Sequence, residues 1–169
     1  MSTQPITINL PKGQVLIDED DIPYMDHLNI GWNVYTTYRG KQYVGGSVKS
    51  KILWLHRLLL DAPAHLQVDH KNGDGLDDRR SNLRLATPAQ NAANRGPDRR
   101  ANRSSRFKGV SLTRSSYRRA RPYMAQVGGH WWGRFATEVE AARAYDAKLV
   151  EIFGEFAKTN ADLGLYTPS

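Results

Sequence analysis

Alternating apolar and polar residues in the first third of the chain predict short β-strands. Residues 6–10 and 14–17 alternate around a Pro-Lys-Gly turn, and "WNVYTTY" and "QYVGGSV" are two β-rich runs joined by a short turn. Between these two pairs, "DEDDIPYMDHL" is compatible with a short helix or with a turn. The run "KILWLHRLLL" also permits strand or helix, and we favour a strand that passes into a short helix before Pro63.

The middle of the chain predicts two strands with a long loop between them and a helix after them. "LQVDH" and "NLRLAT" are the strand candidates, and "KNGDGLDDRRS" between them is rich in turn-forming residues. Thr87 is followed by Pro88 and then by Gln90, which is the pattern of a capping box with proline at the first helical position. We therefore expect a helix over about 88–95, ended by the Gly-Pro pair that follows.

The last third predicts three more strands and a long amphipathic helix. The strand-like runs are "RFKGVSLT", "YMAQVGG" and "HWWGRFAT". Thr137 and Glu140 form a second capping box, and Gly154 is a typical C-cap for the helix that begins there. The predicted apolar stripe of this helix consists of Val139, Ala142, Tyr145, Leu149 and Ile152. These elements predict an α+β protein.

The charge distribution points to a phosphate-rich partner. The chain has 169 residues, a formal net charge of +7 and a pI near 9.8, which favours nucleic acid. Residues 96–134 contain ten Lys and Arg but one Asp or Glu, so this segment carries more than the whole net charge. A disordered basic linker and a phosphate-binding face both explain such a segment, and we favour the binding face.

The composition also excludes several classes of protein. There are no cysteines, so disulfides and thiolate zinc sites are absent. No apolar run is long enough to span a bilayer, and the N-terminus lacks the features of a secretory signal. We therefore expect a cytoplasmic protein whose partner is nucleic acid rather than a membrane or a small-molecule substrate. The oligomeric state is left open.

Four carboxylates, Asp69, Asp74, Asp77 and Asp78, crowd beside His70 in this basic protein. Carboxylates repel phosphates unless a bound cation reverses the local sign. A calcium loop is excluded, because no register provides the required oxygen ligands, glycine and glutamate. The acidic segment is therefore either a loop of turn-forming residues with a solvated charged rim or a site for a different divalent ion.

The positions of Asp69, His70 and Asn91 suggest what such a site contains. Asp69 and His70 end a strand, so their side chains are expected to point to opposite faces. A carboxylate and the amide oxygen of Asn91 suit one hard divalent ion, with Mg²⁺ expected and Mn²⁺ as the alternative. A neutral histidine acts as a general base, and hydrolysis of a phosphodiester needs such a base together with a metal.

The segment "HRLLLDAPAHLQVDHKNGDGLDDRRSNLRLATPAQN" resembles the HNH nucleases, specifically the phage-type HNH homing endonucleases. That family carries an H-R-L start, a D-H-x-x-G-x-x-x-D-x-R core and an N-L-R-x-x-T-x-x-x-N ending. The resemblance implies a ββα-metal module in which Asp69 and Asn91 hold the metal and His70 is the base. It also implies that Asn82 braces the loop and holds the imidazole. Asparagine at position 91, where many relatives have histidine, argues against a tight zinc site.

Other residues of this segment have less specific roles. His56 matches the histidine of the H-R-L element, and we favour a structural role over a catalytic one. Arg84 either contacts phosphate near the cut or forms a salt bridge. Asp77 is expected to pair with Arg79, and Asp78 is expected to shape the loop without taking part in the chemistry.

Residues 105–161 resemble the AP2/ERF DNA-binding domain. The shared marks are F-K-G-V, G-x-F-x-T, E-A-A-x-A-Y-D and G-x-x-A-x-x-N, in that order. The resemblance implies a three-stranded antiparallel sheet that enters the major groove of duplex DNA, with one helix packed behind it. Lys108 and Trp131 match DNA-contacting positions, although Trp131 is also explained by packing, and Trp132 is expected in the core. The first turn supplies further candidates for phosphate contacts, namely Arg114, Arg118, Arg119 and Arg121.

Together these patterns predict a metal-dependent DNA endonuclease of the HNH homing type. One rival is a non-catalytic DNA-binding regulator with a degenerate nuclease fold, and another is a protein that binds or cleaves RNA. The N-terminal leader either braces the nuclease or touches DNA. The expected divisions are a β-rich leader (1–50), the HNH module (51–96), a linker (97–104), the AP2/ERF-like domain (105–161) and a tail (162–169).

Overall fold

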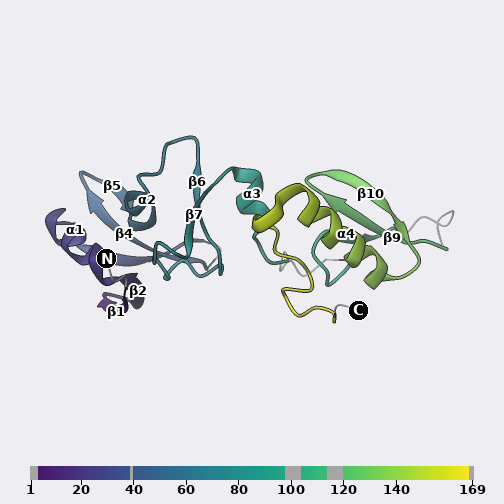
Figure 1. Cartoon of the computed structure of the whole chain (residues 1–169), viewed down its shortest axis with the longest axis horizontal. Coiled ribbons are helices and arrows are strands. Elements are labelled where there is room, and N and C mark those ends of the chain that lie inside the picture. Colours follow the sequence, from purple (N-terminus) through teal and green to yellow (C-terminus); the bar gives the residue numbers. More distant parts are fainter. Residues whose placement is uncertain (1–3, 39, 98–103, 114–119, 168–169) are drawn as a thin grey trace. The chain divides into compact units, whose positions relative to one another are not determined.

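Several small antiparallel sheets and a few helices make up the fold, in agreement with the mixed α and β content that the sequence predicts (Figure 1). The computed structural model describes residues 4–38, 40–97, 104–113 and 120–167. The chain divides into two units, Met1–Asn91 and Ala92–Ser169. Within the described residues, no helix combines the length and the apolar character that a bilayer span requires.

Three small sheets make up the strands of the first unit. Both predicted hairpins form, and the second is extended by a further strand in the order β3-β4-β5. The two strands predicted around the long acidic loop also pair with each other. The strands are β1 (Pro5–Leu10), β2 (Gly13–Asp18), β3 (Trp32–Thr36), β4 (Gln42–Val48), β5 (Lys51–Trp54), β6 (Gln67–His70) and β7 (Leu83–Ala86).

Short helices lie between these strands and after the last of them. The segment compatible with helix or turn forms a 3₁₀ turn, η1 (Glu19–Asp21), and then α1 (Ile22–His27). The predicted passage from strand to helix is confirmed, because β5 is followed directly by α2 (Leu55–Leu59). The third helix is α3 (Pro88–Ala93).

The predicted capping box at the start of α3 is present in full. The main-chain N–H of Gln90 donates to the Thr87 hydroxyl at 3.2 Å, and the Thr87 N–H donates to the Gln90 side chain at 2.8 Å. These bonds satisfy N–H groups that have no partner within a helix.

The leader and the β6–β7 hairpin share one hydrophobic core. Val15 and Ile17 of β2 are fully buried, and they belong to the same cluster as Val68 of β6 and Leu83 of β7. Each such side chain contributes about 1.5–3 kcal/mol when it is fully buried. The leader therefore helps to stabilise the hairpin, whereas its boundary at residue 50 stays a prediction.

Strand β2 also holds the long loop between β6 and β7 through its main chain. The N–H of Leu16 donates to the carbonyl of Leu76 at 2.9 Å, and the N–H of Asp78 donates to the carbonyl of Leu16 at 2.8 Å. The guanidinium of Arg80 binds the buried carboxylate of Asp21, with a shortest distance of 2.7 Å. These contacts give the acidic loop a defined conformation on the leader.

The described residues of the second unit form one sheet and one long helix, as the sequence predicts. The strands β8 (Val110–Leu112), β9 (Tyr123–Val127) and β10 (His130–Phe135) are antiparallel, in the order β10-β9-β8. Helix α4 (Glu138–Phe153) follows, with both bonds of the predicted capping box at Thr137 and Glu140, and it leads into η3 (Gly154–Phe156).

The buried face of α4 differs from the predicted stripe at its C-terminal end. Tyr145 and Leu149 are buried against the sheet, as expected. Ile152, however, is 46% exposed, so its inclusion in the stripe is wrong. The half-buried Phe153 packs on this core instead, because it lies four residues after Leu149 and so returns to the same helical face. The helix ends at Gly154, which has a positive φ of 51° and confirms the predicted C-cap.

Candidate active site

The β6–β7 hairpin places Asp69 and His70 at the end of β6. Asp69 lies opposite Arg84 and His70 lies opposite Leu83 in the antiparallel register. Because side chains alternate along a strand, adjacent residues face opposite sides of the hairpin. The contacts of Asp69 and His70 are accordingly different, and they define two clusters.

The first cluster contains Asp69, Arg84, Gln67 and Asn91. Asp69 is 3% exposed, and its Oδ2 accepts a hydrogen bond from Arg84 Nε at 2.9 Å and forms an ion pair with Arg84 Nη2 at 2.8 Å. Of the two predicted roles of Arg84, the structure shows the salt bridge. Gln67 shares the Asp69 face of β6, and the amide of Asn91 donates to Gln67 Oε1 at 2.5 Å. The side chains of Asp69 and Asn91 therefore belong to the same side of the hairpin.

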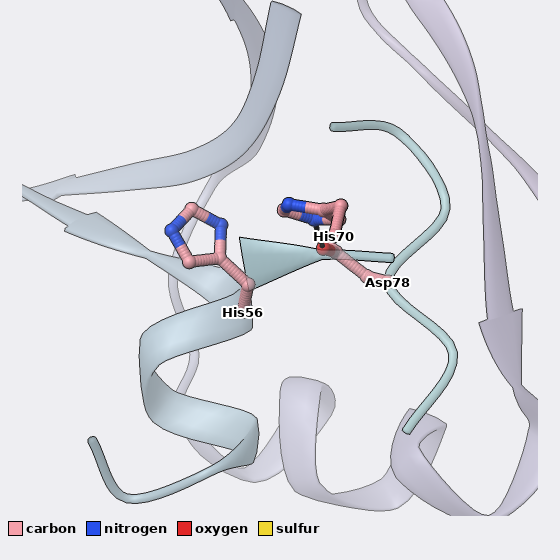
Figure 2. Close-up of side chains that lie close together, drawn as sticks. All are labelled: His56, His70 and Asp78. Atoms are coloured by element: carbon pink, nitrogen blue, oxygen red, sulfur yellow. Dashed lines mark hydrogen bonds and ion pairs between the residues drawn. The ribbon is translucent and has the colours of Figure 1, made fainter. Parts of the chain in front are cut away.

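The second cluster contains His70, Asp78 and His56, and all three side chains are buried. His70 Nε2 lies 2.9 Å from Asp78 Oδ1, and the rings of His56 and His70 are 5.2 Å apart, centroid to centroid. Figure 2 shows the side chains converging from α2, from the end of β6 and from the loop after it. One nitrogen or oxygen atom from each residue lies within 4.8 Å of the other two.

The environment of this cluster changes the charge of its members. Burial, aided by the charges of His70 and Arg57, lowers the pKa of His56 to about 3, so that its imidazole is neutral near pH 7. Burial raises the pKa of Asp78, although the hydrogen bond and charge of His70 act in the opposite direction. The aromatic ring of Tyr43 borders both histidines, with centroid distances of 5.6 Å to His56 and 5.9 Å to His70.

Asp78 is a member of this site that the sequence analysis assigned to loop formation alone. Its side chain is fully buried, and its partner is the predicted base, His70. Its neighbour Asp77 behaves as predicted, because both of its oxygens accept bonds from Arg79 at 2.7 Å. That pairing lowers the pKa of Asp77. The sequence of the loop has no periodic pattern, so it does not predict that one of these two carboxylates is placed beside His70 and the other beside Arg79.

Asn82 ties the two ends of the acidic loop together. Its side-chain amide donates to the carbonyl of Asp77 at 2.8 Å and to the side chain of Asn72 at 3.1 Å. Its side-chain oxygen accepts from the main-chain N–H of Asn72 at 3.1 Å. These bonds correspond to the predicted bracing role, whereas contact of Asn82 with the imidazole of His70 stays a prediction.

The predicted DNA contacts of the second unit have different environments. Lys108 is 8% exposed, and its ammonium donates to the carbonyls of Ala93 at 2.5 Å and Lys158 at 2.9 Å. Burial lowers the pKa of Lys108 to about 8. This is the placement of a structural lysine rather than of a surface contact. Arg121 is exposed. Three predicted contacts lie outside the described residues, namely Arg114, Arg118 and Arg119.

One face of the β8–β10 sheet is turned away from α4. Ala125 and Val127 face the helix, so the alternating positions of β9 face the other way. Trp131 pairs with Gln126 on that open face and is 58% exposed. Trp132 was expected in the core, but it is 40% exposed, and a lysine ammonium lies 4.1 Å from the centre of its ring. Trp132 lies at a register shift in β10, where it has no partner in the pairing with β9.

Comparisons with known proteins match the β6–β7 hairpin and α3. A family model described as HNH endonuclease matches residues 61–93. An uncharacterized HNH endonuclease of Acanthamoeba polyphaga mimivirus is 34% identical over 134 residues, which cover 75% of this chain and 67% of the relative. No solved structure matches the chain.

Proposed function

The chain belongs to the HNH endonuclease family, and from this premise we propose that it is a metal-dependent endonuclease of duplex DNA. The observation that carries the proposal is the hairpin with Asp69 and His70 at the end of one strand. Asn82 holds the loop beside them, and Asn91 lies in the helix that follows. Hydrolysis of a phosphodiester requires a base for water and a cation for the leaving oxygen, and we assign the base to His70 and the ligands that would hold the cation to Asp69 and Asn91.

The donor atoms on the Asp69 face fit a hard divalent ion. They are the carboxylate of Asp69 and the carboxamide of Asn91, whose nitrogen donates to Gln67, so its oxygen is the atom suited to a cation. Mg²⁺ is the expected ion and Mn²⁺ the alternative. Arg84 binds the same carboxylate, and its guanidinium provides a cation for a DNA phosphate at this face. The bound ion supplies positive charge that stabilises the leaving oxygen.

The side chains of the chain have separate roles in this proposal. The imidazole of His70 takes a proton from the attacking water, and Asn82 keeps the acidic loop in position. The family resemblance, rather than a measured contact, assigns the base. The phage-type homing role is likewise a proposal that rests on the sequence resemblance.

We further propose that the second unit positions the DNA as an AP2/ERF-like domain. Support comes from the three antiparallel strands with one helix on a single face, and from the exposed Trp131 on the opposite face. Arg121 is exposed, and the arginines at 114, 118 and 119 extend the positive charge of the same segment. Lys108 has no part in this contact, since its ammonium is buried.

Plasmid cleavage in Mg²⁺, with and without a chelator, tests the nuclease. We expect His70→Ala to lower the rate by at least about a hundredfold, since a general base contributes at least that much. The matched control is His65→Ala, because His65 is exposed and lies outside both clusters. The proposal fails if the wild type does not cut DNA with any divalent ion. Cutting of RNA in preference to DNA supports the RNA rival instead.

The same assay combined with a gel shift tests the division of labour between the units. Asp69→Ala and Asn91→Ala are expected to abolish cutting while DNA is still shifted, because the second unit provides the binding. Loss of the shift in these variants contradicts that division.

A further inference from the structure

The cluster of His56, His70 and Asp78 has the composition of a metal site different from the oxygen site proposed for Mg²⁺. It offers two imidazole nitrogens and one carboxylate, each from a buried side chain. His56 is 9% exposed, His70 5% and Asp78 0%. Because His70 faces the opposite side of β6 from Asp69, the two sets of donors do not share a ligand.

Two buried atoms of this cluster have no hydrogen-bond partner. Among the described residues, three buried side-chain atoms lack one, and two of these are His56 Nδ1 and Asp78 Oδ2. Buried polar atoms are nearly always satisfied, so these two atoms are available as ligands for a bound ion. The third unsatisfied atom, on Arg134, lies in the other unit.

The chemistry of the donors selects the class of ion. Imidazole nitrogen binds Zn²⁺ and Co²⁺ well, whereas Mg²⁺ prefers oxygen. Tyr43 borders both rings, and His56 also stacks on Trp54 at 6.3 Å between centroids, which restricts the orientation of the ligands.

We propose that His56, His70 and Asp78 bind a divalent ion of the zinc class, and that this ion inhibits DNA cleavage by occupying the imidazole of His70. The inhibition rests on the proposed function of His70 as the base, whereas the binding does not. The ion binds the lone pair of one ring nitrogen of His70, and the neutral imidazole keeps its proton on the other nitrogen, so no lone pair remains to accept a proton from water.

The spacing of the donors is compatible with such a site after a small adjustment. Ligand atoms around tetrahedral zinc are about 3.3 Å apart, given bonds of about 2.0–2.1 Å. The donor atoms of the three residues lie within 4.8 Å of one another. Closure therefore requires a side-chain movement on the order of 1 Å, which ring and carboxylate rotations provide.

Co²⁺ is the probe for binding, because its visible absorption spectrum reports nitrogen ligation independently of catalysis. We expect the full chain to bind one equivalent of Co²⁺ with nitrogen ligation, and Zn²⁺ to displace it. His56→Gln and Asp78→Asn are expected to weaken binding at least about tenfold. Asp69→Asn and Asn91→Ala, on the other face, are the matched controls and are expected to bind Co²⁺ as the wild type does.

Three results overturn the proposal. The first is a Co²⁺ affinity that His56→Gln and Asp78→Asn leave unchanged, and the second is loss of Co²⁺ binding in Asp69→Asn. The third is no Co²⁺ binding by the wild type, in which case a buried water satisfies His56 Nδ1 and Asp78 Oδ2. X-ray absorption at the zinc edge of the wild type provides a test without mutation. Two imidazole ligands are expected, and fewer than two contradict the site. Because this measurement uses the wild type, it remains decisive even if a variant fails to fold.

Inhibition is measured separately, as the ratio of Mg²⁺-supported cleavage rates with and without Zn²⁺ for each protein. We expect at least about tenfold inhibition of the wild type and a smaller ratio for His56→Gln. Equal ratios refute the inhibitory role. If the protein cuts no DNA at all, the proposed function fails, while the Co²⁺ spectrum still decides whether the site exists.

Discussion

At the scale of single residues, burial and partners separate side chains that are identical in the sequence. Asp77 and Asp78 are adjacent carboxylates, yet Arg79 lowers the pKa of the first and burial raises the pKa of the second. Asp69 differs again, because it forms an ion pair with Arg84. Four acidic residues near one histidine therefore do not make one uniform acidic patch.

Lys108 provides a residue-scale prediction about pH. Its pKa is about 8 in the folded protein and 10.5 when unperturbed, so between these values the unfolded chain binds more protons. The free energy of unfolding should therefore rise with pH across this window, by on the order of 2 kcal/mol between pH 7 and pH 10. The comparison is with Lys108→Met, in which this contribution is absent. Urea unfolding at a series of pH values measures it, and parallel pH profiles for the two proteins contradict it.

At the scale of elements, turn and cap residues determine where strands and helices begin and end. Contacts between elements determine the conformation of the acidic loop between β6 and β7. The β1–β2 and β9–β10 hairpins and the capping boxes at Thr87 and Thr137 follow from short local patterns. The conformation of the acidic loop depends instead on the main chain of β2. The leader thereby helps to position Asp78 beside His70. The sequence allows two roles for the leader, bracing the nuclease or touching DNA, and this contact supports bracing.

Two glycines of the second unit allow an element-scale prediction. Gly109 and Gly128 both have positive φ, of 71° and 58°. A Cβ at Gly109 would overlap the ring of Tyr145, whereas a Cβ at Gly128 would meet nothing within 4 Å. Gly128→Ala should therefore cost about 1 kcal/mol through backbone strain alone. Gly109→Ala should cost about 3 kcal/mol or more, because the buried helix must also shift. Urea unfolding measures both, and equal losses would show that the overlap with Tyr145 is unimportant.

At the scale of the whole molecule, charge is concentrated in one stretch of the chain. Residues 96–134 have a net charge of +9, whereas residues 135–169, which include α4, have a net charge of −3. In the described part of this stretch, Lys108 is buried but Arg121 is exposed. Binding of DNA by this segment should therefore be electrostatic and largely independent of sequence.

This distribution predicts a steep dependence of DNA binding on salt. With about four phosphate contacts, the dissociation constant should rise by about a hundredfold between 50 and 200 mM monovalent salt. Fluorescence anisotropy with labelled duplex DNA and the His70→Ala variant measures this without cleavage. A dissociation constant that does not change with salt excludes the proposed role of the basic segment.

The sequence by itself determined the order of the elements and the set of residues around the acidic loop. Alternation, turn residues and caps are local signals, so the strands, α3 and α4 were predictable within a few residues. The order of Asp69, His70, Asn82 and Asn91 also pointed to the family that the comparisons identify.

Only the tertiary structure decided which of these side chains meet. The main-chain N–H of Arg80 donates to the carboxylate of Asp18, 62 residues away in the sequence. The main-chain N–H of Lys108 donates to the side-chain oxygen of Asn160, 52 residues away. No periodic sequence pattern extends over such separations. Asp78, which pairs with His70, donates a main-chain hydrogen bond to β2, and the ammonium of Lys108 donates to a carbonyl in the segment after α4. Burial and partners arise from packing between distant segments, and they therefore decide the chemistry of a side chain that its local sequence leaves open.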